Sequence, residues 1–125
     1  MATPPDQCFK WGIFDRDPLP VWSTGRVTLL GDAAHPTTPF LGQGAAMAIE
    51  DALVLERAIV AAGSVGEALA RYEKARVARA NGVLVASREN GLNLTTTDPD
   101  RYDEATHRNE ESLDLAGYDA MTVPV

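Results

Sequence analysis

The stretch RVTLLGDAAHPTTPFLGQGAAMAIEDALVLERAI, residues 26–59, decides the fold of this 125-residue chain. Its first part, RVTLLG at residues 26–31, is a nearly continuous apolar run with β-favouring side chains. Such a run is typical of a strand buried on both faces of a parallel sheet. Asp32 would then follow the carboxyl end of that strand, which is the edge where open α/β sheets bind ligands. We therefore expect the α/β fold class, with Asp32 in a candidate site.

A shaped loop and a helix follow the expected strand. Pro36 and Pro39 prevent a regular helix in the loop. Gly42 and Gly44 permit backbone angles that other residues avoid. From Gly44 onward, apolar side chains recur at helical spacing, so we expect a first long helix that ends near Gly63.

A second long helix is expected to begin after Ser64. Ser64 and Glu67 have the spacing of a capping box, in which each side chain satisfies a backbone donor near the other. The helical pattern continues to about Asn90, with Gly91 as its expected terminator. The Asn-Gly pair at 81–82 is a candidate kink or break.

The organisation that we expect is one incomplete domain in three parts. Residues 1–24 form an extended arm or short strand, and residues 25–91 contain the strand, the loop and the two helices. Residues 92–125 form a polar C-terminal segment with a turn at 98–100 and a short helix. A lone strand leaves two unpaired edges and an uncovered apolar surface, so this set of elements lacks the partner strands that a stable parallel sheet needs.

Composition narrows the classes of function. Eighteen acidic and eleven basic side chains give a formal net charge of -7, which argues against a nucleic-acid partner. No stretch approaches the roughly 20 apolar residues of a membrane span. The first ten residues lack the order of a signal peptide, and the single Cys8 cannot form an internal disulfide. We therefore expect a cytoplasmic protein with no membrane partner.

Some candidate positions have both a ligand-binding and a structural interpretation. Asp32 suits hydrogen bonds from the hydroxyls of a sugar or sugar alcohol, and it also suits an Asx-turn or a helix cap. Gly42-Gln43-Gly44 would let a flat ligand approach the main chain at a helix start, where negative charge is favoured. A plain glycine-rich helix entry is the alternative. His35 suits either a hydrogen-bonded structural role or a catalytic base.

Other catalytic and binding motifs are missing from the sequence. His107 has no companion at metal-ligand spacing, so we interpret it as a surface residue and expect no metal site. There is neither a G-x-S-x-G elbow nor a Walker lysine. Gly42-x-Gly44-x-x-Met47 departs from the dinucleotide fingerprint at Met47, so we do not interpret it as a pyrophosphate site.

Taken together, these motifs resemble a known family. GRVTLLGDAAHPTTPFLGQGAAMAIEDALVLERAI, residues 25–59, resembles the second FAD-binding segment of class A flavoprotein monooxygenases, which are aromatic hydroxylases. The flanking WGIFDRDPLPVW, ALARYEKARVARANGVLVASRENG and GYDA are similar to the salicylate hydroxylase and 6-hydroxynicotinate 3-monooxygenase branch. The resemblance implies FAD as cofactor, NADH or NADPH as co-substrate, and a small aromatic substrate.

The resemblance also implies roles for single residues. Asp32 would bind the ribityl chain of FAD, and the backbone at Ala45 and Ala46 would face the pyrimidine side of the flavin ring. Pro39, the expected catalytic residue, would help to wall the dry pocket in which oxygen reaches the aromatic ring. The cofactor-binding set implied by the resemblance is Gly31, Asp32, Leu41, Gly42, Gln43, Gly44, Ala45 and Ala46.

The sequence also departs from the family. Members begin with a G-x-G-x-x-G strand-turn-helix for the ADP half of FAD, and this sequence has none. We therefore expect a C-terminal fragment of a Rossmann-like FAD-binding domain, inactive as an isolated chain. Its partner would be the missing amino-terminal portion or a complementing chain, and a homodimer is a further possibility. The alternatives are a non-catalytic remnant or association module, and a stand-alone flavin-binding or redox domain.

Overall fold

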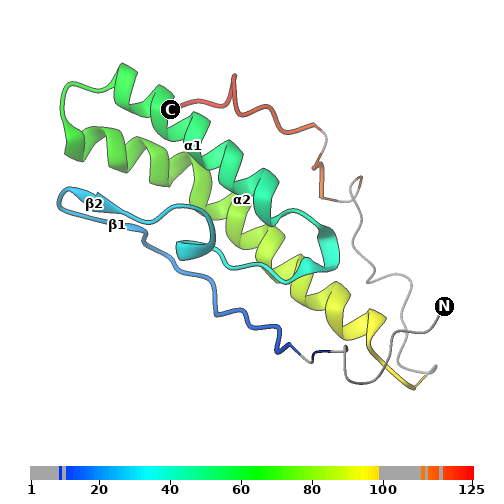
Figure 1. Cartoon of the computed structure of the whole chain (residues 1–125). Coiled ribbons are helices and arrows are strands. Elements are labelled where there is room, and N and C mark those ends of the chain that lie inside the picture. Colours follow the sequence, from blue (N-terminus) through cyan, green and yellow to red (C-terminus); the bar gives the residue numbers. More distant parts are fainter. Residues whose placement is uncertain (1–8, 10, 99–110, 112, 116) are drawn as a thin grey trace.

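Two long helices, packed side by side and joined by a tight loop, form the body of the molecule (Figure 1). The computed structural model describes residues 9, 11–98, 111, 113–115 and 117–125. The segment that precedes α1 lies on one side of the helical pair, and the C-terminal segment lies on the other (Figure 1). The elements are β1 (Ser23–Thr24), β2 (Val27–Thr28), the 3-10 helices η2 (Gly31–Ala33) and η3 (Pro39–Leu41), α1 (Gly44–Ala61) and α2 (Val65–Leu94).

The prediction of a strand buried on both faces is wrong for this chain. Only β2 forms within residues 26–31, and it pairs antiparallel with β1, with Thr24 opposite Val27. Gly25, at a φ of +59°, makes the turn between them, so the pairing is local. Val27 is 64% exposed. This hairpin is the whole sheet within the described part of the chain.

Apart from its own hairpin, the extended segment before α1 has no neighbouring strands among the described residues, and side chains of α2 bind its backbone instead. Glu73 accepts the backbone N–H groups of Trp22 and Ser23 at 2.8 and 2.6 Å. The Tyr72 hydroxyl donates to the Leu29 carbonyl at 3.2 Å. Backbone groups near a core need such partners. Further bonds of this kind join Asn81 to Leu19, Ser87 to Thr38 and Arg88 to Arg16.

The helix starts agree with the sequence prediction. α1 begins at Gly44 and ends at Ala61, close to the expected end. Ser64 Oγ accepts the Glu67 N–H at 3.2 Å. Glu67 Oε2 in turn accepts the Gly63 N–H at 3.0 Å. The predicted capping box is therefore confirmed.

α2 is longer than the sequence pattern indicates. It is continuous through residues 81–82 and through Gly91, so the helix has no break at 81–82 and Gly91 is not its terminator. A glycine costs only about 1 kcal/mol in a helix interior, and packing against α1 and the amino-terminal half outweighs that cost. The helix ends where the Thr95 hydroxyl and N–H both donate to the Gly91 carbonyl, at 2.6 and 3.1 Å. No helix in the described part of the chain is long and apolar enough to cross a membrane.

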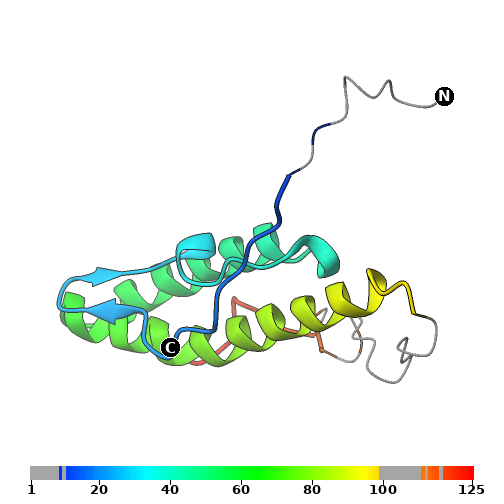
Figure 2. The same ribbon diagram turned by 90° about the horizontal axis from the view of Figure 1, so that it is seen from below.

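The amino-terminal arm contains no regular structure at residues 9 and 11–22. Followed back from residue 22 toward the N-terminus, the arm passes the loop that follows β2 and then leads away from the helices (Figure 2). Phe9, Trp11 and Phe14 on this arm are all largely exposed. The expected short helix after residue 98, together with Cys8 and His107, lies outside the described residues.

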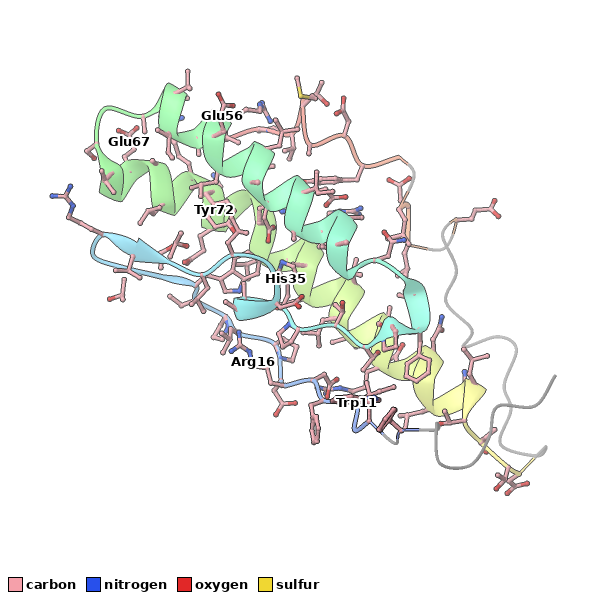
Figure 3. All side chains as sticks on the ribbon, in the orientation of Figure 1. Trp11, Arg16, His35, Glu56, Glu67 and Tyr72 are labelled. Atoms are coloured by element: carbon pink, nitrogen blue, oxygen red, sulfur yellow. The ribbon has the colours of Figure 1, made fainter. Side chains whose placement is uncertain are left out.

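The core lies between the two helices and the loop that precedes them. Figure 3 shows His35 and Tyr72 in the space between the loop and the helices, where both are fully buried. The Trp22 ring packs against both, with centroids 5.5 Å from His35 and 5.9 Å from Tyr72. Polar groups also lie in this core, and buried polar groups need partners. The buried polar side chains are His35, Asp51, Arg76, Ser87 and Asn90.

Candidate functional site

A cavity opens between the turn that follows β2, the proline loop and the start of α1. Its volume is about 750 Å³, within the roughly 300–1,000 Å³ of small-molecule and cofactor sites. Six of the nine residues predicted for the site line it, although their roles remain predictions. The six are Gly31, Asp32, Pro39, Gly42, Gly44 and Ala45.

The cavity lining also differs from the prediction. Leu41, Gln43 and Ala46 are not among the lining residues, whereas Thr37, Thr38 and Ala48 are. Two signals in the sequence could have indicated the missed residues. The threonines stand between the two prolines of the loop, and Ala48 lies one helical turn after Gly44 on the same face.

Asp32 lies on the exposed rim of this cavity. No side chain caps the 3-10 helix in which Asp32 lies. No hydrogen bond from a described residue reaches the Asp32 carboxylate. The structure therefore gives no support to the capping or Asx-turn interpretation, and the carboxylate is available to a ligand.

Gly31 gives the turn its shape. Its φ is +58°, in the left-handed region that favours glycine. A Cβ at Gly31 would lie 3.3 Å from the Ala48 Cβ on α1, which is a tight contact. The Gly31 carbonyl accepts the N–H groups of Ala34 and His35, both at 2.8 Å. The 31–35 turn is therefore closed by its own backbone and lies directly against α1.

The start of α1 has no side-chain cap. Gln43 occupies the capping position without a side-chain hydrogen bond to the helix, and the first turn carries no acidic residue. Gly42, just before it, has a φ of +65°. A Cβ at Gly44 would lie 3.1 Å from the Thr37 Oγ1. An uncapped helix start presents backbone N–H groups and the positive end of a dipole, which favour a negatively charged ligand.

A buried ion-pair network lies behind the cavity. The Asp51 Oδ2 is 2.6 Å from the His35 Nε2, and Arg76 Nε donates to the Asp51 Oδ1 at 2.7 Å. All three side chains are fully buried. Arg76 also pairs with Glu50 at 2.7 Å. His35 thus has the hydrogen-bonded structural position that was one of its two interpretations, and it does not line the cavity.

The charge state of Asp51 follows from these contacts. Burial by itself would raise the pKa of Asp51. Hydrogen bonds from His35, from Arg76 and from the Gly31 N–H outweigh burial and hold the pKa below its ordinary value of 3.8. Asp51 is therefore an ionised carboxylate at neutral pH, with its charge compensated by Arg76.

Comparison with known proteins identifies the family. Residues 4–87, more than half of the chain, match a family model described as FAD binding domain. The chain belongs to this FAD binding domain family. It is 42% identical over 118 residues to 6-hydroxynicotinate 3-monooxygenase from Pseudomonas fluorescens, covering 93% of this chain and 27% of that protein. It is 47% identical over 83 residues to 3-hydroxybenzoate 6-hydroxylase 2 from Aquipseudomonas alcaligenes, covering 66% of this chain and 26% of that protein.

A solved structure of an FAD complex has the same fold. The crystal structure of Klebsiella pneumoniae HpxO complexed with FAD and uric acid matches with a TM-score of 0.68 at 32% identity. The match covers 80% of this chain and 28% of that chain. The FAD binding domain chain thus spans about a quarter of the length of the relatives it matches. The resemblance to class A flavoprotein monooxygenases is confirmed, with FAD as the cofactor of the family.

Proposed function

We propose that this chain is the flavin-contacting part of an FAD-dependent monooxygenase that hydroxylates a small aromatic substrate with NADH or NADPH and oxygen. One observation carries the proposal: the exposed Asp32 carboxylate and the uncapped start of α1 at Gly44 line the same cavity. Relatives named for 6-hydroxynicotinate and 3-hydroxybenzoate support an aromatic acid as the substrate class.

The residues around the cavity suit the ribityl and ring portions of FAD. The Asp32 carboxylate is an acceptor for ribityl hydroxyls. The backbone N–H groups at the start of α1, including Ala45 and Ala46, suit the negative charge of a reduced flavin ring. At Gly42 an added Cβ would meet nothing within 4 Å, so the main chain there is open to a flat ligand. The observed donors, acceptor and space therefore match the chemistry of the cofactor.

The protein contributes position and exclusion of water, whereas bound flavin supplies electron transfer from the nicotinamide and the reaction with oxygen. Asp32 holds the sugar-alcohol chain. Pro39 lines the cavity and has no backbone N–H, so it adds a rigid wall without a donor. Such a wall helps to keep water from the site of oxygen transfer.

The remainder of the site belongs to polypeptide outside this sequence in our proposal. This chain, the C-terminal part of a Rossmann-like domain, would be inactive alone. It would act with the amino-terminal portion of the enzyme or with a complementing chain. The exposed side chains of Phe9, Trp11 and Phe14 support this, because large apolar side chains that are close in the sequence and exposed are available to a partner surface. A cytoplasmic location and a homodimer belong to the same proposal.

The proposal is tested by titrating the chain with riboflavin, which carries the ring and the ribityl group without the nucleotide. Asp32→Ala should weaken riboflavin binding by at least about tenfold, because hydrogen bonds to a charged group are worth about 1.5–3 kcal/mol. Glu56→Ala is the matched control, since Glu56 is an exposed acid on α1 outside the cavity lining. Equal quenching of flavin fluorescence by the chain and its Asp32→Ala variant would contradict the ribityl assignment.

The claim of incompleteness has its own test. The isolated chain should not catalyse NADH- or NADPH-dependent reduction of FAD. A chain that binds FAD tightly and reduces it alone would support the stand-alone flavin domain instead. A chain that associates with a partner without any flavin would support the association module.

A further inference from the structure

We propose that Asp51 is a positioning residue for the turn at residues 31–35. Its carboxylate fixes this turn on the two helices and thereby sets the position of the Asp32 side chain. The consequence for flavin rests on the function proposed above. The fixing of the turn does not depend on that function, because it concerns contacts within the chain alone.

Asp51 holds both ends of the turn with one oxygen. Its Oδ2 accepts the Gly31 N–H at 2.9 Å and lies 2.6 Å from the His35 Nε2. Gly31 and His35 are the first and last residues of the turn, and Asp32 lies between them. The backbone bonds from Ala34 and His35 to the Gly31 carbonyl close the same turn. A single carboxylate therefore determines where the segment that carries Asp32 lies on α1.

The other oxygen of Asp51 is held from α2. Arg76 Nε donates to the Asp51 Oδ1 at 2.7 Å, across 25 positions of sequence. Arg76 is itself fixed by Glu50 at 2.7 Å and lies 5.1 Å from the centroid of the Tyr118 ring in the C-terminal segment. Because these contacts restrict Arg76, they also restrict the orientation of the Asp51 carboxylate. The position of the turn thus depends on both helices and on the C-terminal segment.

Asp51 acts on Asp32 only through the backbone. Asp51 is fully buried and does not line the cavity, whereas Asp32 is exposed on its rim. Among the described residues outside the turn, the other side chain that hydrogen-bonds to it is Arg16, which is exposed and donates to the carbonyls of Ala33 and Ala34. An exposed contact is screened by water and is weaker than a buried one. The buried carboxylate is therefore the main side-chain determinant of where the turn lies on the helices.

The test uses Asp51→Asn and measures amide hydrogen exchange in the full chain without flavin. The amide of Gly31 donates to Asp51, and those of Ala34 and His35 donate to the Gly31 carbonyl within the turn, so all three report its opening. Asp51→Asn should speed their exchange at least about tenfold more than it speeds exchange in α2. Glu50→Gln is the matched control, because it removes a carboxylate from the same arginine without touching the turn. It should change the ratio of turn to α2 exchange much less than Asp51→Asn does, because Glu50 reaches the turn only through Arg76.

Two further measurements keep the proposal falsifiable. If Asp51→Asn does not fold, His35→Leu removes the hydrogen bond between the turn and Asp51 Oδ2 while keeping the Asp51–Arg76 pair, and the same exchange ratio tests the proposal. Exchange that rises equally in the turn and in α2 would overturn the proposal, since Asp51 would then support only global stability. If the wild-type chain binds riboflavin, the variant should bind at least about tenfold more weakly, and unchanged affinity would also overturn it. Absence of riboflavin binding by the wild type would count against the proposed function alone, because the exchange ratio is measured without flavin.

Discussion

The two long helices begin in opposite ways. At the start of α2, Ser64 accepts the Glu67 N–H, and Glu67 accepts the Gly63 N–H and pairs with Arg71 at 2.7 Å. At the start of α1, Gln43 caps nothing and no acid lies in the first turn. The start of α2 directly follows the short loop that joins the helices, whereas the start of α1 lines the cavity of the candidate site.

This difference shows where the chain uses local stabilisation and where it does without it. A capped helix start satisfies its own backbone donors, so few remain for a ligand. An uncapped start keeps its donors available, but it loses the stabilisation of a cap. α1 compensates further along, where Asp51 and Arg76 join the helices in a buried ion pair. The comparison therefore separates a start built for stability from one suited to binding.

The largest expected effect comes from removing the compensation at α1. Asp51→Leu should lower the free energy of unfolding by about 3–5 kcal/mol, because it removes the fully buried carboxylate that pairs with Arg76 and leaves only the partly exposed Glu50 beside that charge. Urea denaturation followed by circular dichroism measures the change. The effect should be clearly larger than that of Glu67→Gln at the exposed α2 pair. Similar losses in the two variants would contradict the view that α1 depends on its buried pair.

Lowering the pH should also show that the stability of the fold depends on the Asp51 carboxylate. The pKa of Asp51 is lower in the folded chain than its ordinary 3.8, because His35, Arg76 and the Gly31 N–H stabilise the carboxylate more than burial destabilises it. A group with a lowered folded pKa stabilises the fold above its unfolded pKa and loses this contribution as the pH falls through the folded value. The free energy of unfolding should therefore fall below about pH 3.8. The difference between the wild type and Asp51→Asn should shrink over that range, and a constant difference would disprove the linkage.

A glycine pair gives an effect of intermediate size. Gly42→Val should destabilise the chain by about 1–2 kcal/mol, because a branched side chain would have to adopt a left-handed backbone. Gly82→Ala is the matched control, since Gly82 lies inside α2 and a Cβ there meets nothing within 4 Å. That substitution should stabilise the chain by about 0.5–1 kcal/mol. Thermal unfolding should show a lower melting temperature for Gly42→Val and a higher one for Gly82→Ala. Shifts of the same sign would contradict the different backbone requirements of the two glycines.

The smallest effects compare the two capping positions directly. Ser64→Ala should cost about 1 kcal/mol, since it removes the acceptor for the Glu67 N–H. Gln43→Ala should change the free energy of unfolding by less than about 0.5 kcal/mol, because Gln43 caps no helix donor. Chemical denaturation of the two variants side by side measures the contrast. A cost at position 43 equal to that at position 64 would remove the distinction between the two starts.

Sequence patterns predicted the parts of this structure that depend on near neighbours. The capping box and the start of α1 follow from side chains a few residues apart. The same reasoning failed for residues 26–31, where an apolar run indicated a buried strand and a glycine turn instead produced an exposed hairpin. It also ended α2 too early, because packing along the helix overrides a local glycine signal. Six of the predicted site residues do share one cavity, since the loop that carries them is short and its prolines and glycines limit its path.

By itself, the sequence determined the family, the two helix starts and the loop that carries the candidate site, because these depend on motifs of adjacent residues. Only the tertiary structure decided that Asp51 contacts His35 and Arg76, which lie 16 and 25 positions away in the sequence. Asp51 and the neighbouring Glu50 are both acids on the same helix, and the packed structure shows that Asp51 is the one that is fully buried. Burial of one acid opposite an arginine and a turn makes the difference, and burial is a property of the packed helices.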